Sequence, residues 1–433
     1  MKPVRFLHVA DVHLGATPYQ DTERSRDYHR VLLDTVARVA IPGGADFVIV
    51  AGDLFDRRQI EPAVLAQATE VFDTLRRAGI PVYAIEGNHD RKGFTSRVTW
   101  LDYLSEWGLV HLLEPVHAED GTPRFVPWDP VTRRGSYLDH GDVRILGSMW
   151  YGSTTAKLVP ALAKALSELP PAAYHLMMLH AGLDGFLDHY DGGLTVQDLA
   201  PLKDAGVDYL ALGHIHKRYE ADGWIYNPGS LEALNVAEYR EERGYYWVEV
   251  DPAARTHVAT HGSDQPQRPV HRLAFDVTPW GDPAGLLEAA IAHVRGEAGR
   301  LAPLHPTSDA VRRPVVELTL IGRLGFRRHE IERPVLEQAL QEAFDAQVAR
   351  LSVEALPPDV AGLAEAGPER DRPALEREVL RELARRDSRY EAIAESTGDL
   401  LASLKRQVLA GADPAQLADL VARHLDPEIK CTS

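Results

Sequence analysis

The chain has 433 residues, of which 45% are hydrophobic and 26% charged, and its formal net charge is −17. This composition is typical of a globular protein and excludes a disordered or fibrous chain, while the length predicts two or three domains. A single cysteine, Cys431, excludes a disulfide framework and favours a cytoplasmic location. We expect no signal peptide and no membrane span, because no apolar run has the required length.

The first part of the chain alternates apolar strands with amphipathic helices. Strands are predicted at 4–10, 46–51 and 80–85, and helices at 28–40 and 62–77. Each strand is followed by polar residues. This β-α-β-α-β order predicts a parallel sheet whose carboxyl ends carry the chemistry.

The next part is richer in strands. The pattern predicts one helix at 155–168 and strands at 109–113, 124–126, 143–147, 175–179, 209–212, 225–230 and 244–250. The stretch 262–269, which contains Gly, Ser, Asp and Pro, is typical of a linker. We therefore predict a first domain over residues 1–262.

A smaller unit and a helical tail follow. Strands at 270–277, 314–321 and 347–353 with helices at 283–295 and 329–344 predict an α+β module, assigned to residues 268–355. Residues 356–373 are rich in Pro, Gly and acid, which predicts a flexible linker. Three amphipathic helices are predicted within 374–427. Their apolar faces could pack on one another, on the second domain or on a partner.

Polar side chains follow five of the predicted strands. Oxygen and imidazole ligands converge there, without any cysteine: Asp11, His13, Asp53, Asn88, His89, His180, His214 and His216. In Asp-x-His and His-x-His both side chains point to the same side of an extended segment and can reach one centre. For a lone histidine a satisfied core residue is the better interpretation. Five such motifs favour a site for divalent ions such as Mn²⁺, Fe²⁺ or Zn²⁺ over a structural zinc.

These motifs resemble a known family. Asp11-x-His13, Gly52-Asp53-x-x-Asp56, Gly87-Asn88-His89-Asp90, His180 and Gly213-His214-x-His216 resemble the signature of the calcineurin-like metallophosphoesterases. The surrounding sequences resemble the double-strand-break repair nucleases, whose bacterial branch is SbcD. The resemblance covers residues 4–262. It implies a layered α/β fold, a β-sandwich flanked by helices, with a small α+β DNA-capping domain and a C-terminal helical tail.

The resemblance also implies roles for individual residues. One ion would be held by Asp11, His13, Asp53 and His216. The other would be held by Asp53, Asn88, His180 and His214, so that Asp53 bridges the two ions. Both ions are expected to be Mn²⁺. His89 would stay off the metals and protonate the leaving 3′ oxygen. Asp56 would be a carboxylate that orients His89. The alternative for Asp56 is an acid at a helix start that pairs with Arg57 or Arg58.

Basic pairs follow three of the ligand motifs. They are Arg57-Arg58, Arg91-Lys92 and Lys217-Arg218. The net charge of −17 argues against a nucleic-acid partner over the whole chain. A local basic rim around the metals would satisfy phosphate binding in spite of it. The alternative for each pair is a solvated surface.

The resemblance thus implies a Mn-dependent DNA nuclease, a 3′–5′ exonuclease and single-strand or hairpin endonuclease that uses a metal-activated water. By the resemblance, the terminal helices would bind a coiled-coil ABC-type ATPase of the SbcC type, and the chain would form a homodimer through 62–77 or 94–107. The alternatives are a metallophosphoesterase for a small phosphodiester or nucleotide, and a non-catalytic scaffold. Because no ligand is missing, the scaffold is disfavoured. The physiological metal, the exonuclease polarity and the identity of the ATPase stay open.

Overall fold

The computed structural model describes residues 3–92, 98–186, 193–301, 313–357, 372–385, 390, 393–409 and 414–425. It divides into two compact units, the first made of 1–272, 298–317 and 340–350, and the second of 273–297, 318–339 and 351–433. The domain boundaries predicted from the sequence, at 262, 268, 355 and 373, stay predictions.

The first unit is built on two six-stranded sheets. The order of the first sheet is β14-β13-β1-β2-β3-β4. Its strands are β1 (Val4–Val9), β2 (Phe47–Val50), β3 (Val82–Ala84), β4 (His111–Leu112), β13 (Tyr245–Asp251) and β14 (Thr256–Gly262). The strands β1 to β4 are parallel, and β13 and β14 extend the sheet in antiparallel order.

The second sheet has the order β11-β12-β10-β9-β8-β7. Its strands are β7 (Tyr137–His140), β8 (Val143–Gly147), β9 (Tyr174–His180), β10 (Tyr209–Gly213), β11 (Tyr219–Ala221) and β12 (Ile225–Asn227). The four inner strands are parallel and the two edge strands antiparallel. A short hairpin of β5 (Val116–His117) and β6 (Pro123–Arg124) stands apart from both sheets.

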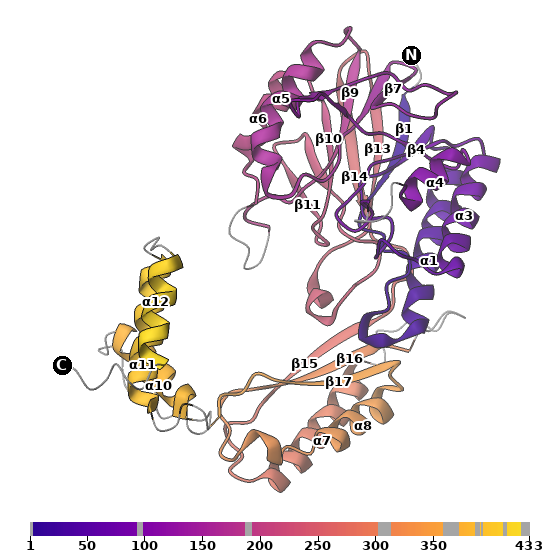
Figure 1. The fold of residues 1–433 in the computed structure, drawn as a ribbon. Coiled ribbons are helices and arrows are strands. Elements are labelled where there is room, and N and C mark those ends of the chain that lie inside the picture. Colours follow the sequence, from indigo (N-terminus) through magenta and orange to yellow (C-terminus); the bar gives the residue numbers. More distant parts are fainter. Residues whose placement is uncertain are drawn as a thin grey trace. The chain divides into compact units, whose positions relative to one another are not determined.

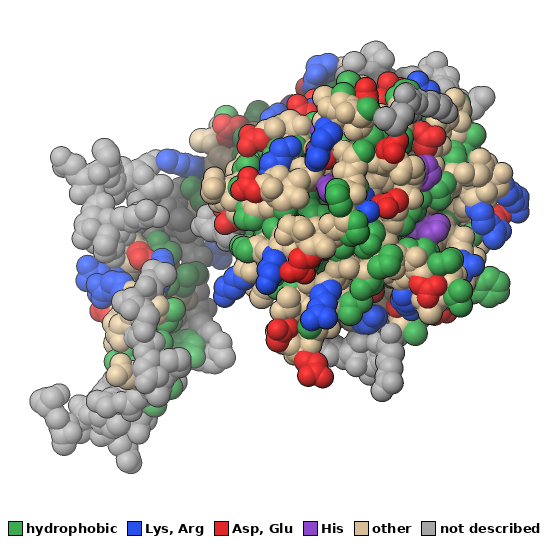
Figure 2. Space-filling model, turned by 90° about the horizontal axis from the view of Figure 1, so that it is seen from above, with side chains coloured by type: hydrophobic (Ala, Val, Ile, Leu, Met, Phe, Trp, Pro, Cys, Tyr) green, Lys and Arg blue, Asp and Glu red, His purple; other side chains and the backbone are tan. Residues whose placement is uncertain are grey.

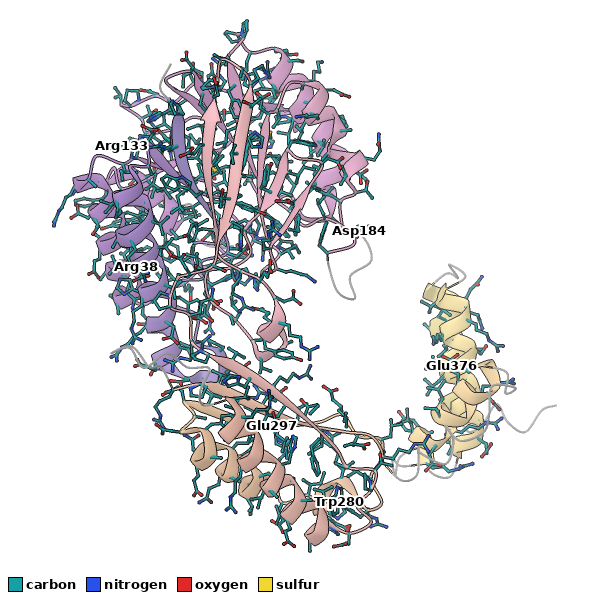
Figure 3. All side chains as sticks on the ribbon, turned by 180° about the vertical axis from the view of Figure 1, so that it is seen from behind. Arg38, Arg133, Asp184, Trp280, Glu297 and Glu376 are labelled. Carbon is teal, nitrogen blue, oxygen red and sulfur yellow. The ribbon has the colours of Figure 1, made fainter. Side chains whose placement is uncertain are left out.

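Helices cover the outer face of each sheet (Figure 1). The helices α1 (Thr22–Thr35), α3 (Pro62–Arg77) and α4 (Trp100–Glu106) lie beside the first sheet, and α5 (Thr155–Ser167) and α6 (Val196–Asp204) beside the second. Side chains fill the space between the layers (Figure 3). Each interface is apolar, with Tyr28, Val31 and Phe72 packed on one sheet and Leu162 and Leu199 on the other. The predicted sandwich flanked by helices is therefore confirmed.

Strands β5, β7, β11 and β14 were not predicted, and three helices differ from the prediction for a local reason. Helix α1 begins at Thr22, six residues before the predicted start, because the Asp21 side chain accepts the N–H of Glu23 and caps it. Helices α4 and α6 were not predicted. Both start with a capping box that uses Asp in place of Glu at the third position, Thr99 with Asp102 and Thr195 with Asp198.

Aromatic side chains join the two sheets. Phe6 and Phe47 stack with ring centroids 5.0 Å apart, and Phe6 meets the edge of Tyr209 from the other sheet at 5.2 Å. His8 is buried in the same layer, where its Nδ1 lies 3.0 Å from the Tyr209 hydroxyl and its Nε2 3.1 Å from the Leu212 carbonyl. Burial lowers the pKa of His8 to about 3. This histidine is therefore neutral in the folded protein.

We expect His8 to cause part of the acid lability of the fold. An unfolded histidine takes up a proton near pH 6.5, so below that pH the unfolded state is favoured by about 1.4 kcal/mol per pH unit until the pH nears the folded pKa. His8→Gln should remove this component. Free energies of unfolding from urea titrations at pH 7 and pH 5 should therefore differ less in His8→Gln than in the wild type. The exposed His329→Gln is the control, and equal pH dependence in all three proteins would contradict the prediction.

Beyond residue 262, the described residues form a small sheet and five α-helices. The sheet has the order β15-β16-β17, from strands β15 (Val270–Asp276), β16 (Val315–Ile321) and β17 (Val348–Val353). The helices are α7 (Pro283–Leu301), α8 (Arg333–Phe344), α10 (Arg372–Arg385), α11 (Ala394–Leu409) and α12 (Pro414–Leu425). Arg381 of α10 pairs with Asp399 of α11 at 2.8 Å. Within the described residues no helix combines the length and apolarity that a membrane crossing needs.

Candidate metal centre

Eight polar side chains meet where parallel strands of both sheets end. We call this set the centre: Asp11 and His13 follow β1, Asp53 follows β2, Asn88 and His89 follow β3, His180 ends β9, and His214 and His216 follow β10. The two sheets thus contribute to one site from the same edge, as open α/β sheets do at their carboxyl ends. The structure brings together every residue that the sequence singled out as a ligand.

One half of the centre consists of Asp11, His13 and His216. Their ligand atoms all lie within 4.8 Å of one another. The Nε2 atoms of His13 and His216 face each other at 3.2 Å. Both oxygens of Asp11 also accept the backbone N–H of His214 at 2.9 Å, which fixes the carboxylate against the loop after β10.

The other half consists of Asp53, Asn88, His180 and His214. Ligand atoms of Asp53, His180 and His214 lie within 4.8 Å of one another. The side-chain oxygen of Asn88 lies 3.1 Å from His180 Nε2 and 2.9 Å from His214 Nδ1. The other ring nitrogen of His180 donates to the Ala51 carbonyl at 2.9 Å, so its Nε2 is directed at the centre.

Asp53 lies between the two halves. Its Oδ2 is 3.2 Å from His180 Nε2 in one half and 3.9 Å from His13 Nε2 in the other. Its Oδ1 accepts the backbone N–H of His89 at 2.8 Å. A carboxylate in this position can reach two cations at once, which is the property that a bridging ligand needs.

The backbone at the centre is strained. Asp11, His13 and Asp53 have φ near +50° and His214 has φ of +94°, conformations that non-glycine residues rarely adopt. A Cβ atom at Gly87 would clash with Asp53, so glycine is required where the loop after β3 passes that carboxylate. Strain of this kind persists only where the surroundings enforce it, and it collects at functional sites.

His89 is oriented by Asp56, although not by the group that the sequence predicted. His89 Nδ1 donates to the backbone carbonyl of Asp56 at 2.6 Å. The Asp56 carboxylate instead lies 3.5 Å from His13 Nδ1 and 3.2 Å from Arg57 Nε. The expected contact between carboxylate and His89 is therefore replaced by a carbonyl contact, and the alternative pairing with Arg57 is present.

Two supporting carboxylates were not found from the sequence. Glu238 lies 3.1 Å from His216 Nδ1, and Asp90 accepts the backbone N–H groups of Leu54, Phe55 and Gly87 at 2.9–3.2 Å. Glu238 is 22 residues from His216, without a motif that links them. Asp90 stands in the turn that the sequence emphasised, yet it ties two loops together and is absent from the groups that could hold a metal.

The charges of the centre fit a bound cation. Burial alone would lower the pKa of His180, but the Asp53 carboxylate raises that pKa to about 9. Burial also opposes protonation of His216, yet its hydrogen bond to Glu238 raises its pKa. The raised pKa of both imidazoles reflects the negative charge of the carboxylates around them, which divalent ions would balance. The nitrogen and oxygen donors suit ions such as Mn²⁺, Fe²⁺ and Zn²⁺.

Glu238→Gln should weaken metal binding at the half that contains His216. Loss of a carboxylate that orients a ligating histidine typically costs 10–100-fold in affinity. We expect Mn²⁺ titration calorimetry to show one weakened site of two. Glu220→Gln, an exposed change on β11, is the control. Two unchanged sites in Glu238→Gln would contradict the assignment of His216.

The basic residues near the centre are partly neutralised. Lys217 pairs with Glu241 at 3.3 Å and Arg218 with Glu220 at 3.1 Å, and Arg57 contacts Asp56 as described above. The guanidinium of Arg91 lies 4.5 Å from the ring centroid of Trp150. Arg58 is half-buried and Lys92 exposed. On the face shown in Figure 2, blue and red side chains are interspersed.

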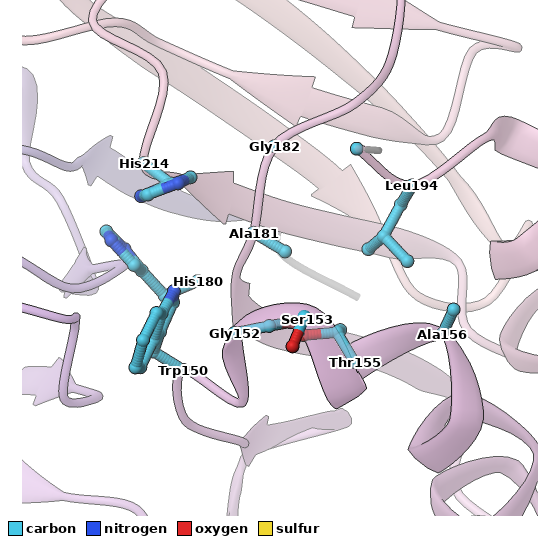
Figure 4. A pocket seen from close by; sticks show the side chains of 11 residues that line it. Trp150, Gly152, Ser153, Thr155, Ala156, His180, Ala181, Gly182, Leu194 and His214 are labelled. Carbon is cyan, nitrogen blue, oxygen red and sulfur yellow. The ribbon is translucent and has the colours of Figure 1, made fainter. Parts of the chain in front are cut away.

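A pocket of about 200 Å³ opens beside the second half of the centre. Figure 4 shows Trp150, His180 and His214 on one side of it and Leu194 and Ala156 on the other, with the start of α5 between them. Because His180 and His214 also belong to the centre, the pocket and the centre are continuous. Trp150 was not singled out from the sequence, since a tryptophan after a strand carries no motif.

Comparison with known families gives a match to this region. Residues 4–218 match the family described as calcineurin-like phosphoesterase. The matched range contains Asp11, His13, Asp53, Asn88, His89, His180, His214 and His216.

The curated proteins that are similar to the chain include the following three. The DNA double-strand break repair protein Mre11 of Archaeoglobus fulgidus is 33% identical over 261 residues, which are 55% of this chain and 54% of that protein. The uncharacterised metallophosphoesterase YhaO of Bacillus subtilis is 31% identical over 57% of each chain. Mre11 of Aeropyrum pernix is 26% identical over 73% of each chain. The chain spans about half the length of the first two.

Proposed function

The chain belongs to the calcineurin-like phosphoesterase family through residues 4–218, and on this premise we propose that it is a Mn²⁺-dependent nuclease that hydrolyses phosphodiester bonds at DNA ends. The observation that carries the proposal is the convergence of oxygen and imidazole donors from five strand ends around Asp53. The similarity to proteins named for DNA double-strand break repair supports DNA as the substrate.

The residues of the centre would act as metal ligands or as a proton donor. Asp11, His13, Asp53 and His216 would hold one ion, and Asp53, Asn88, His180 and His214 the other. Two bound ions would supply a water that is deprotonated at neutral pH and positive charge for the phosphate. His89, held by the Asp56 carbonyl through Nδ1, keeps its Nε2 available to protonate the leaving 3′ oxygen.

The mode of cleavage follows the family resemblance. We propose 3′–5′ exonuclease and single-strand or hairpin endonuclease activity, in a cytoplasmic protein. Arg57, Arg58, Arg91, Lys92, Lys217 and Arg218 are proposed to contact the phosphate backbone. Ion pairs offset part of their charge, so these contacts form by exchange of a carboxylate partner for a phosphate. Affinity should therefore fall steeply with salt.

The three terminal helices are proposed to bind a coiled-coil ATPase of the SbcC type. The arrangement of α10 and α11 leaves Leu383, Leu401 and Val408 exposed by 55%, 40% and 58%. Large apolar side chains on this scale suit a helix-in-groove contact. Addition of such an ATPase is expected to protect these helices from proteolysis.

A homodimer is proposed to form through helix α4. Tyr103 and Trp107 lie on one side of that helix with ring centroids 5.9 Å apart, and Trp107 is 64% exposed. We expect Trp107→Glu to convert dimer to monomer in sedimentation velocity measurements. Val258→Glu, a similarly exposed change on β14, should leave the dimer intact. A wild-type monomer, or a dimer that survives Trp107→Glu, would contradict this assignment.

The function is tested by incubation of the metal-loaded protein with a 5′-labelled linear duplex, a DNA hairpin and bis-p-nitrophenyl phosphate. We expect cleavage of both DNA substrates in the presence of Mn²⁺ and no cleavage after addition of EDTA. Turnover of the small diester with intact DNA, even after addition of an SbcC-type ATPase, would favour a phosphoesterase for small substrates.

A further inference from the structure

The pocket beside the centre has no role in the chemistry described so far. We propose that it binds one unstacked nucleobase of the substrate, next to the phosphate that is held at the centre. This inference rests on the proposed function, because it assigns the part of the nucleotide that does not react. The terminal nucleotide of a DNA strand and a free nucleotide share this chemistry.

The size of the pocket fits a single base. Its volume is about 200 Å³, below the ~300–1,000 Å³ that is typical of pockets for drug-sized ligands. Alternating apolar and polar positions line it, with Ala156, Ala181 and Leu194 beside Ser153 and Thr155. A planar aromatic ring with a few polar edge atoms matches such a lining.

Trp150 provides the aromatic surface. Its backbone N–H donates to the Glu86 carbonyl at 3.2 Å, which ties the loop after β8 to the loop after β3. Gly152 has φ of +60°, and a Cβ there would lie 3.0 Å from Cζ2 of the indole. The local chain is therefore shaped around the indole. Stacking of a base on an aromatic side chain is tolerant of sequence, as an end-processing enzyme requires.

The pocket adjoins the centre, so a base in the pocket would lie next to a phosphate at the centre. His180 and His214 line the pocket and also hold Asn88 and Asp53 within the centre. The Arg91 guanidinium lies over the Trp150 ring at 4.5 Å, which places a positive charge next to the aromatic wall. A nucleotide whose phosphate lies at the centre would thus have its base within reach of Trp150 and a cation beside it.

If the pocket binds a base, the ends of a duplex must open before cleavage. A base inside the pocket cannot remain paired, and removal of one base from the stack costs a few kcal/mol unless an aromatic surface offsets it. Trp150 would supply that surface.

The test is the binding, in Mn²⁺, of a single-stranded oligonucleotide that carries 2-aminopurine as its 3′-terminal base and phosphorothioate linkages that resist cleavage. Stacking should quench the fluorescence of 2-aminopurine in the wild type. Trp150→Ala should abolish the quenching and weaken binding about 5- to 150-fold, the range found for loss of one stacked base, while Trp150→Phe should retain most of both. Trp128→Ala, at another half-buried tryptophan that lies against His111, is the control.

A second variant avoids the indole altogether. Ala156 is exposed on α5 and lines the pocket, so Ala156→Leu should fill the space, preserve the helix and reduce quenching. Unchanged quenching in Trp150→Ala and Ala156→Leu would overturn the proposal. Free 2-aminopurine nucleotide that competes as well as the strand would identify a small nucleotide as the ligand of this pocket.

Turnover of bis-p-nitrophenyl phosphate in Mn²⁺ separates this inference from the proposed function. That diester has no nucleobase, so Trp150→Ala should reduce its hydrolysis far less than it reduces binding of the 2-aminopurine strand. A parallel loss of this activity would mean that the substitution disturbs the centre, and it would overturn the base pocket. A wild type that quenches 2-aminopurine but hydrolyses neither DNA nor the small diester would reject the nuclease and keep the pocket.

Discussion

Asp53→Asn is expected to abolish metal binding at both halves of the centre, with the fold retained. The carboxylate is 2% exposed and lies between His180 Nε2 at 3.2 Å and His13 Nε2 at 3.9 Å. Asparagine keeps the oxygen that accepts the His89 N–H but carries no charge. Loss of a residue that merely orients a metal ligand lowers metal affinity 10–100-fold. We therefore expect loss of the shared ligand to lower Mn²⁺ affinity more than about 100-fold in calorimetry, with DNA cleavage lost in parallel.

A matched control separates this effect from general loss of a buried carboxylate. Asp102 is 1% exposed and caps α4, where its Oδ2 accepts the Thr99 N–H at 2.9 Å. Asp102→Asn should lower the melting temperature and leave Mn²⁺ affinity unchanged. Two ions bound to Asp53→Asn with wild-type affinity would show that Asp53 does not bridge them.

The sequence predicted the elements of the centre because each ligand is local to a strand end. A buried apolar run such as Phe47–Val50 identifies its strand, and the polar residue that follows marks the carboxyl edge of a parallel sheet. Long periodic helices such as α3 were predicted for the same reason. In each case the signal lies within one short window of sequence.

Contacts between distant segments could not be predicted in this way. Glu238 reaches His216 through a 3₁₀ turn (Val236–Arg240), and the Trp150 loop is tied to Glu86, which is 64 residues earlier. These pairings depend on how the two sheets pack, and the spacing of apolar residues along the sequence does not indicate that packing. The atom that holds His89 was also beyond sequence reasoning, because Asp56 offers both a carboxylate and a carbonyl and only the backbone path decides between them.

His89→Ala is expected to reduce the rate of DNA cleavage by about 10²–10⁴-fold, the usual contribution of a positioned general acid or base, and to leave Mn²⁺ binding unchanged. His89 Nδ1 donates to the Asp56 carbonyl at 2.6 Å, which directs Nε2 away from that loop. However, one ligand atom of His89 also lies within 4.8 Å of those of His13 and Asp53. The measurement is therefore cleavage rate together with metal stoichiometry.

The two outcomes assign His89 without ambiguity. A slow enzyme that binds two ions as the wild type does identifies a proton donor, whereas loss of an ion identifies a ligand. Asp56→Asn sharpens the result, because the carbonyl that holds His89 is unaltered while the charge 3.5 Å from His13 is removed. We expect this variant to cleave DNA much faster than His89→Ala. Equal losses in both would restore the carboxylate as the group that orients His89.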